Sequence, residues 1–406
     1  MLTTDQMNKY ASVLLWGLKT ARTERFKKGD IVLLRYDPLA VSLAEVLYAR
    51  LLESGFHVVL RSTMTARMER SFFEKATAKQ LVFQNPGEKP LYEHIHGSIY
   101  LHAPESLTHL SGTDPRKLGK VAVSRKVFRD ILDRREEKGE FGWTLCLWPT
   151  PALAKQAKLT LRQYKNQIIK ACYLDQADPV KAWRATFRQA QAAKKWLNGM
   201  DVAYFHITSK HTDLKIVPGK QRKWIGISGH NIPSFELFLS PDWRGTEGTY
   251  FADQPSFRSG RYVEGVKLEF KKGRAVGIEA RAGRDFVVEQ LAMDEGACRV
   301  GEFSLTDKRF SKINRFMANT LYDENFGGRQ GNCHIAVGAA YSDTYDGDPQ
   351  TLTPNRKKQL GFNDSALHWD LVNTEKKCVV ARLTSGASVK IYENGMFTYE
   401  SASIHD

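Results

Sequence analysis

KGDIVLLRYDPLAVSLAEVLYARLLESGFHVVL, residues 28–60, contains two β-rich runs separated by an amphipathic stretch. Residues 31–36 are typical of a buried strand, and residues 41–52 carry apolar side chains at helical spacing. Gly55 then provides a common helix stop, and residues 57–60 follow as a second strand. The order strand, helix, strand predicts a parallel sheet with helices on its faces.

The same alternation continues to about residue 175. We expect strands at 98–102 and 143–147, and helices at 117–134 and 152–172. A phosphate-binding loop would need glycines directly after the first strand, where the backbone approaches the anion, but residues 36–40 read YDPLA. Residues 1–177 are therefore expected to form a Rossmann-like α/β domain without a nucleotide.

The rest of the 406-residue chain has a different texture. Residues 178–200 are charged and helix-prone, which predicts a connecting helix between two halves. After them come short β-rich segments separated by Gly, Pro and Asp, at 202–207, 223–227, 235–239, 261–270 and 275–281. This pattern predicts a second domain, residues 201–406, that is β-rich and mainly antiparallel.

The composition favours a cytoplasmic protein. No stretch of about 18 apolar residues is free of charge, so no transmembrane helix is expected. The N-terminal residues have an early Asp5 and lack the pattern of a secretory signal. Five widely spaced cysteines without a C-x-x-C pair indicate reduced thiols, mostly buried.

The net charge of +15 is large enough to attract polyanions. Lys and Arg occur in short groups, such as 271–272 and 356–358, rather than in one stripe with interleaved aromatic residues. A solvated basic surface is therefore favoured, and dedicated nucleic-acid binding is not indicated.

His368-Trp369-Asp370 is the sharpest local signal for chemistry. If this segment is extended, the imidazole and the carboxylate project from the same face of the strand, an arrangement that suits a divalent metal ion. The motif alone is weak, because H-x-D occurs by chance and a lone histidine is more often structural.

His334 and Tyr341 lie seven residues apart in HIAVGAAY. A helix would return both side chains to one face, whereas a strand would place them on opposite faces, and the sequence does not decide between the two. A core histidine and a packed tyrosine remain the structural alternatives.

Glu236 and Glu302 stand in otherwise apolar, β-like surroundings. Burying an unpaired carboxylate costs several kcal/mol, so each residue needs a cation or a dense hydrogen-bond shell. The alternative is a strand edge that faces solvent, and the alternation around Glu236 does not exclude it.

Together these segments resemble the thermophilic aminopeptidase family, of the aminopeptidase T and aminopeptidase S type, along nearly the whole chain. The similar motifs occur in one order: NIPSFELFLSPDWRGTEG (231–248), YVEGVKLEF (262–270), DEGACRVGEFSL (294–305), NTLYDEN (319–325), HIAVGAAY (334–341) and DSALHWD (364–370). Residues 28–60 are also similar to the first strand, helix and strand of that family. Several motifs in order are far more specific than any one of them.

The resemblance implies a metal-dependent aminopeptidase that hydrolyses N-terminal amino acids from peptides. Matched position by position, it implies these metal ligands: Glu236, Glu302, His334, Tyr341, His368 and Asp370. Two divalent ions per chain, from among zinc, cobalt, manganese and magnesium, are expected to share a hydroxide that acts as the nucleophile. Glu302 is the candidate proton acceptor, and Tyr341 is a candidate ligand or oxyanion donor. Family members are homodimers, so a homodimer is expected.

One segment departs from the family pattern. FGGRQGN (326–332) is several residues longer than the connection expected there and could reshape the substrate pocket. Two alternatives therefore stand beside the active enzyme: a catalytically inactive homologue whose cleft this segment blocks, and a basic α/β protein that binds nucleic acid without catalysis.

Overall fold

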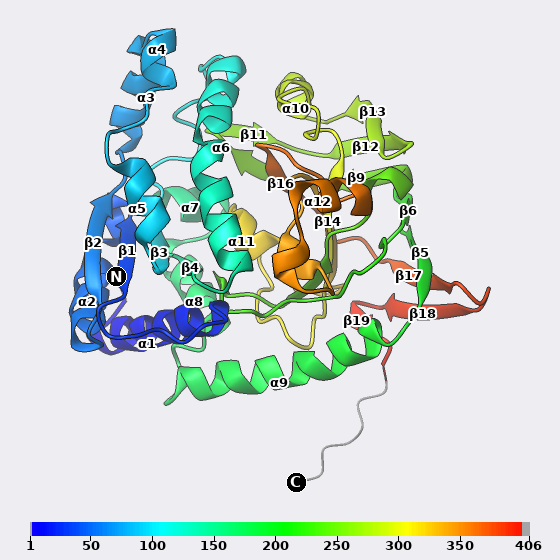
Figure 1. The fold of residues 1–406 in the computed structure, drawn as a ribbon, viewed down its shortest axis with the longest axis horizontal. Coiled ribbons are helices and arrows are strands. Elements are labelled where there is room, and N and C mark those ends of the chain that lie inside the picture. The colour runs from blue at the N-terminus through cyan, green and yellow to red at the C-terminus, as the bar shows by residue number, and fades with distance from the viewer. Residues whose placement is uncertain (1, 400–406) are drawn as a thin grey trace.

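The computed structural model describes residues 2–399 and combines a part built on a parallel sheet with a part built on antiparallel sheets (Figure 1). The predicted fold class is thereby confirmed. The parallel sheet of the described chain has the order β2 (His57–Ser62), β1 (Ile31–Tyr36), β3 (Gly97–His102), β4 (Gly142–Leu147) and β7 (Asn231–Ile232). Its first four strands lie where the sequence predicts them.

Helices cover both faces of the parallel sheet, because its strands are apolar on both sides. Val32 and Leu34 of β1 pack into the main core with helices α1 (Thr4–Ala21) and α2 (Val41–Glu53). Leu33 points the other way, into a smaller core with Leu91 of α5 (Glu88–His94) and Leu132 of α6 (Pro115–Glu137). This two-sided burial is characteristic of a parallel sheet between helical layers.

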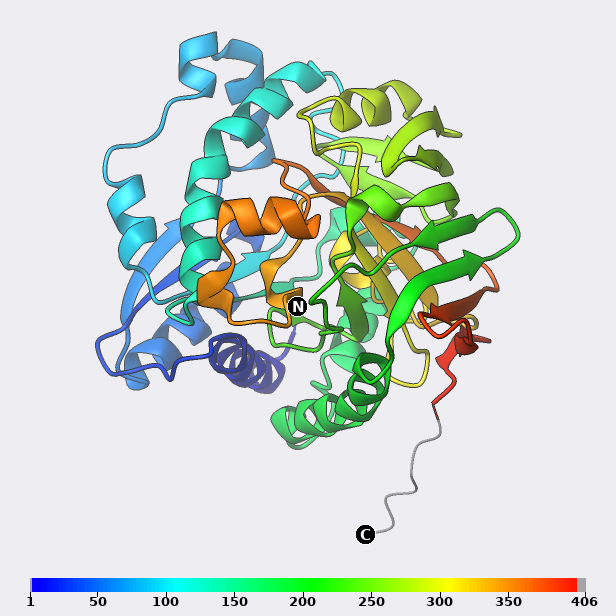
Figure 2. The same cartoon turned by 45° about the vertical axis from the view of Figure 1, so that its right-hand side comes forward.

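Other helices frame the sheet and connect it to the second part. They are α3 (Ala66–Lys75), α4 (Ala78–Leu81), α5 (Glu88–His94), α6 (Pro115–Glu137), α7 (Pro151–Gln156), α8 (Leu161–Ala171) and α9 (Pro179–Asn198). Helix α9 runs along the lower edge of the molecule in Figures 1 and 2.

Two antiparallel sheets form the second part. The larger contains β13 (Arg274–Glu279), β12 (Val266–Lys271), β9 (Glu247–Ala252), β6 (Asp213–Ile216), β5 (Val202–Thr208), β17 (Cys378–Leu383), β18 (Ser388–Glu393) and β19 (Met396–Phe397). The smaller contains β16 (His368–Asn373), β15 (Asn332–Gly338), β14 (Val300–Thr306) and β8 (Glu236–Leu239). A hairpin of β10 (Ser256–Arg258) and β11 (Arg261–Val263) and the helices α10 (Arg284–Leu291), α11 (Thr320–Asp323) and α12 (Pro354–Leu360) complete this part.

The two antiparallel sheets pack against each other through large buried side chains. The Tyr250 hydroxyl of β9 donates to the carbonyls of Cys333 and Leu371, at 3.2 and 2.7 Å. The rings of Phe205 and Phe303 lie 5.7 Å apart across the interface. One face of the small sheet is thus buried in the core, and its other face is available for polar residues.

Three predicted elements differ from the structure. Residues 152–172 form two helices, because Lys158 adopts a positive φ of 56° and Thr160 caps a new helix through Gln163. Residues 223–227 form only a single bridge between Ile225 and Phe238, since Ile227 also has a positive φ. Residues 261–270 divide at Gly265, φ 64°, into β11 and β12.

Strand β7 joins the parallel sheet although it follows α9 in sequence. Leu145 and Cys146 of β4 pair with Asn231 and Ile232, so the chain returns to the first part before it reaches β8. The division of the chain at residues 177 and 200 stays a prediction. Within residues 2–399 no helix combines the length and apolar character that crossing a membrane requires.

Candidate metal centre

The registers of the small sheet bring predicted ligands from different strands to one face. Ser304 of β14 lies opposite His334 of β15, and Ala336 lies opposite Asp370 of β16. Opposed residues in an antiparallel pair project to the same side, and residues two apart on one strand share that side. His334 and Asp370 therefore face the same way.

The remaining ligand candidates join this face by the same rule. Glu302 precedes Ser304 by two residues, and His368 precedes Asp370 by two. Glu236 begins β8 opposite Thr306, which follows Ser304 by two residues. The sequence expectation for His368 and Asp370 as a same-face pair on a strand is confirmed.

A bulge in β14 adjusts the position of Glu302. The pairing with β15 shifts between Val300 and Glu302, so Gly301 is the extra residue. A Cβ atom at Gly301 would stand 2.2 Å from the carbonyl oxygen of Ala339, which only glycine avoids. Bulges commonly redirect a side chain next to a functional site.

His334 is surrounded by three carboxylates. Its Nε2 lies 3.1 Å from Glu302 Oε1, 3.2 Å from Glu236 Oε2 and 3.8 Å from Asp370 Oδ1. His334, Glu236 and Glu302 are 1%, 4% and 3% exposed. So much charge in a buried space needs cationic compensation.

His368 occupies the other end of the cluster. Its Nε2 lies 3.4 Å from Asp370 Oδ1 and 3.8 Å from Glu302 Oε2, while its Nδ1 lies 2.9 Å from the carbonyl oxygen of Ala339. Because a carbonyl can only accept, Nδ1 carries the proton and the Nε2 lone pair is directed into the cluster.

The donor atoms fall into two groups of metal-ligand spacing that share one residue. Glu236, Glu302 and His334 form the first group, and Glu302, His368 and Asp370 form the second; within each, the donor atoms lie within 4.8 Å of one another. Oxygen and imidazole donors of this kind suit hard or borderline divalent ions. Five of the six predicted ligands are thus in one cluster.

Tyr341, the sixth predicted residue, lies at the edge of the cluster. It follows the end of β15 at Gly338, so the choice between helix and strand for HIAVGAAY is resolved as a strand with Tyr341 beyond it. Its ring lies 4.8 Å from that of His368 and 5.9 Å from that of Phe238. The residue keeps 38% exposure, so it stands at the entrance to the cluster.

Without bound cations, two buried carboxyl groups of the centre have raised pKa values. Burial, with help from Glu302, raises the pKa of Glu236 to about 8 against the lowering effect of His334. Burial and then the charges of Glu236 and Asp370 raise the pKa of Glu324 well above its usual value. Glu236 therefore retains its proton near neutral pH when no cation is bound.

The charges of the cluster also shift the pKa values of His334 and Asp370. Burial alone would lower the pKa of His334, but Glu236, Glu302 and Asp370 raise it to about 9. For Asp370, burial acts to raise the pKa, whereas His368, His334 and Arg258 lower it to about 2. A cluster that holds extra protons on both acids and imidazoles is one in which divalent cations can replace protons, and the residues fit such ions.

Three residues around the cluster were not predicted from the sequence. Ser304 Oγ donates to Glu236 Oε2 at 2.8 Å, and its position two residues after Glu302 could have revealed it. Glu324 lies within the quoted motif NTLYDEN, but nothing in the letters distinguishes it from its neighbours. Arg258 donates to the carbonyl of His368 at 2.9 Å from a distant hairpin that no local pattern connects to the site.

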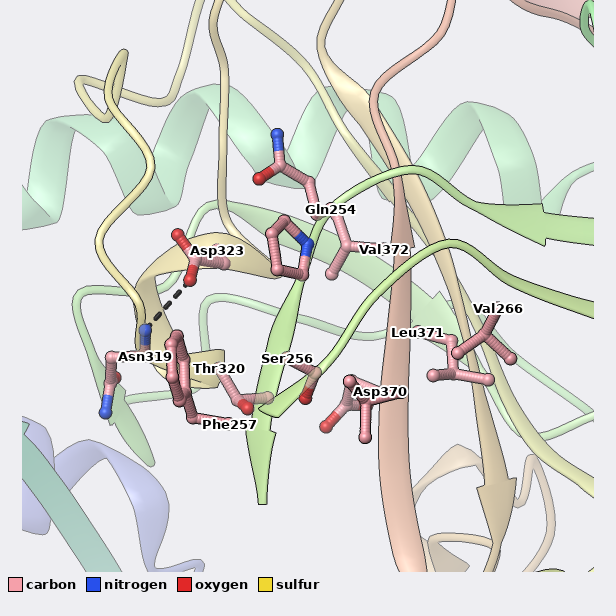
Figure 3. A pocket seen from close by; sticks show the side chains of 12 residues that line it. Gln254, Ser256, Phe257, Val266, Asn319, Thr320, Asp323, Asp370, Leu371 and Val372 are labelled. Atoms are coloured by element: carbon pink, nitrogen blue, oxygen red, sulfur yellow. Dashed lines mark hydrogen bonds between the residues drawn. The ribbon is translucent and has the colours of Figure 1, made fainter. Parts of the chain in front are cut away.

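A small pocket of about 10 Å³, room for about one water molecule, adjoins the cluster at Asp370 (Figure 3). Its walls combine apolar and polar side chains from β10, α11, β12 and β16, among them Ser256, Phe257, Val266, Thr320 and Val372. Asp323 is already engaged there, because its carboxylate accepts from the backbone N–H of Met317 and Asn319 at 2.7 and 2.8 Å. The pocket thus offers a mainly neutral surface next to a candidate ligand.

Comparisons with known proteins agree with this geometry. Aminopeptidase T of Thermus aquaticus is 29% identical over 70% of this chain and 72% of that protein. Aminopeptidase AmpS of Bacillus subtilis is 29% identical over 64% and 63%, and aminopeptidase PepS of Streptococcus thermophilus is 30% identical over 57% of each chain. The solved structure of wild-type AmpT from Thermus thermophilus superposes with a TM-score of 0.78 at 22% identity, covering 98% of this chain and 100% of that one, which shows a shared fold.

The sequence model of one family matches residues 3–397, nearly the full length, and includes all six predicted site residues. With the shared fold and the clustered donors, this match identifies the chain as a member of the thermophilic metalloprotease family M29.

Proposed function

We propose that this protein is an aminopeptidase that binds two divalent metal ions in the cluster and removes N-terminal residues from peptides. Glu236, Glu302 and His334 would hold one ion, and Glu302, His368 and Asp370 the other. Support for the activity comes from the metalloprotease family and from relatives that carry aminopeptidase names.

The observation that carries the proposal is the placement of Glu302 between the two donor groups. Its Oε1 lies beside His334 and its Oε2 beside His368, at 3.1 and 3.8 Å. With one oxygen toward each donor group, Glu302 would help to hold both ions. Hydrolytic sites with two metal ions use such sharing to hold the ions close together.

Divalent ions at such a site lower the pKa of water toward about 7 and polarise a carbonyl group. The chain's own residues supply the rest. Glu302 belongs to both donor groups and is the candidate to accept the proton from water. Although 38% of Tyr341 is exposed, desolvation by the surrounding protein and then the charges of Glu302 and Asp370 keep its pKa above the usual value, so its hydroxyl remains a hydrogen-bond donor to a developing oxyanion.

An inactive homologue fits the contacts less well. The departing segment 326–332 is fixed by hydrogen bonds: the N–H groups of Gly327 and Gly328 donate to the carbonyl of Ile313, and the Asn332 amide donates to the carbonyl of Glu324. These contacts fix the segment between α11 and β15. They favour a scaffolding role over a blocked cleft.

The test combines ion content with hydrolysis of aminoacyl anilides. We expect elemental analysis to find two ions per chain in the wild type, and exhaustive chelation to abolish release of N-terminal residues until divalent ion is restored. Glu302→Gln should lose both ions, whereas Ser304→Ala, which changes a neighbour of Glu236, should keep them. Activity that survives complete ion removal would refute the proposal.

We also propose that the protein is a cytoplasmic homodimer divided near residues 177 and 200. The free state of all five cysteines supports a reducing compartment, and the resemblance to dimeric family members supports the dimer. The helix α9 between the two kinds of sheet supports the division. Light scattering of the purified protein tests the dimer by its mass.

A further inference from the structure

The positive charge of the protein is concentrated in one region. Residues 151–200 contain ten Lys and Arg but only two Asp and no Glu, a surplus of eight charges out of a net charge of +15. Helix α9 itself carries five basic residues and no acidic one, and Asp178 is its N-cap. The catalytic proposal uses none of these residues.

Four basic residues of α9 lie in one line. Lys181, Arg184, Arg188 and Lys195 are separated by three, four and seven residues. At about 100° per residue, this spacing places them within an arc of about 60° and along about 21 Å of the helix axis. All four are exposed, and we call them the α9 stripe.

The α9 stripe is not neutralised by the protein. None of its four side chains lies within 4.0 Å of a carboxylate in the part of the chain from residue 2 to 399. Helix α6 shows the contrast, because its Lys126 and Arg129 pair with Asp130 and Asp133 on the same helix. The four unpaired cations repel one another, and binding a polyanion reduces that repulsion.

The opposite side of α9 fixes the stripe in place. Trp183, Ala190 and Leu197 are buried, and the Trp183 ring stacks on Phe235 at 5.3 Å. Near the end of the helix, Lys194 Nζ donates to the carbonyl of Gly226 at 3.1 Å. The stripe is therefore held on a rigid helix that needs no folding when it binds.

We propose that the α9 stripe binds the sugar–phosphate backbone of duplex nucleic acid without reading its sequence. Lys and Arg are the side chains that contact phosphates, and about 21 Å corresponds to about six base pairs at 3.4 Å each. This surface is additional to the catalytic cluster. The sequence alone, in which Lys and Arg occur in short groups, did not indicate it because the alignment arises only when the helix forms.

The exposed residues beside the stripe argue against the other polyanionic partners. Gln189, Gln191 and Ala192 flank it, and no large apolar or aromatic residue of α9 is exposed. A helix that inserts into a membrane interface needs Trp, Phe or Leu on its outer face. Single strands are commonly held by exposed aromatic rings, which are also missing from α9.

Salt dependence provides the first measurement. Four phosphate contacts on a duplex predict that log Kobs falls with log salt at a slope of about −3.6, or about 150-fold between 50 and 200 mM. The assay is fluorescence anisotropy of a labelled 20-base-pair duplex with the intact, metal-loaded protein. Absence of binding at 50 mM salt would overturn the proposal.

Charge-reversed variants separate the stripe from net charge. The stripe variant combines Lys181→Glu, Arg184→Glu, Arg188→Glu and Lys195→Glu. The control makes the same change in charge at exposed positions of the antiparallel part: Lys210→Glu, Lys220→Glu, Lys271→Glu and Arg274→Glu. We expect the stripe variant to bind more than 100-fold more weakly and the control less than tenfold.

Equal losses in both variants would overturn the proposal, because they would show attraction by net charge alone. Binding to phosphatidylserine vesicles or polyglutamate, without binding to the duplex, would also overturn it. Circular dichroism, ion content and anilide hydrolysis should be unchanged in both variants. If the glutamate version of the stripe does not fold, the corresponding four glutamine substitutions still predict a slope reduced by about 3 to 4.

Discussion

Removal of the metal ions should make the stability of this protein fall as pH rises. In the ion-free protein, Glu236 keeps its proton up to a pKa of about 8, compared with 4.5 in the unfolded chain. The folded state then binds more protons than the unfolded state between these two values, so the free energy of unfolding decreases with pH. The stability that protonated Glu236 contributes is fully present below pH 4.5 and is lost as the pH rises through about 8.

The magnitude follows from the size of the shift. A difference of about 3.5 pKa units at about 1.36 kcal/mol each corresponds to about 5 kcal/mol for the fully buried Glu236. His334, with its pKa raised from 6.5 to about 9, acts in the same direction over a higher window. The two residues share the same electrostatic interaction, so their effects are not additive and about 5 kcal/mol describes the pair. Such a loss is a large fraction of ordinary domain stability.

Urea unfolding of chelated protein at pH 5.5, 7.0 and 8.5 measures this change. Glu236→Gln mimics the protonated acid, so we expect it to be slightly more stable than the wild type at pH 5.5, which lies just above the unfolded value of 4.5, and to exceed it most at pH 8.5. Ser304→Ala removes a neighbouring hydroxyl without removing a charge, and it should retain the wild-type slope. A wild-type stability that is flat or rises between pH 5.5 and 8.5 would refute the reasoning.

Two further predictions separate the roles of individual residues. His368→Ala should remove the ion of the second donor group and leave far-UV circular dichroism unchanged, because His368 lies at the start of β16 and 19% of its side chain is already exposed; full ion content would contradict this assignment. Tyr341→Phe should lower kcat by about 10²- to 10³-fold while ion content stays at the wild-type value, as expected for loss of one oxyanion donor. A loss of ions in Tyr341→Phe would instead make the tyrosine a ligand.

The parts of the fold that depend on short-range pattern could be predicted from sequence. Strand β1 occupies the predicted residues because five of its six side chains are apolar or β-prone and a helix with clear spacing follows. The errors in the predicted elements arise from the backbone conformations of single residues. Lys158 and Ile227 take positive φ values that side chains rarely adopt, and no sequence rule identified them.

Within the candidate site, too, only the residues related by short-range spacing could be predicted from sequence. The spacing of His368 and Asp370 could be interpreted locally, because a strand places both on one face. The position of Glu236 beside His334 depends instead on the pairing of β8, β14 and β15, which are separated by long loops. For these residues the resemblance to a family provided what spacing could not. Neither the residue spacing nor the family resemblance identified Arg258, since its contact with His368 is through a backbone carbonyl.

Strand β7 has a consequence for exchanging segments between relatives. Its two residues are hydrogen-bonded to β4, and only three residues separate its end from Glu236. A chimera joined within α9 would therefore pair one parent's β4 with the other parent's β7, and any mismatch would be transmitted to the first ligand. Crossover points placed after β8 would inherit strand and ligand from the same parent, and libraries designed in that way should retain more folded members.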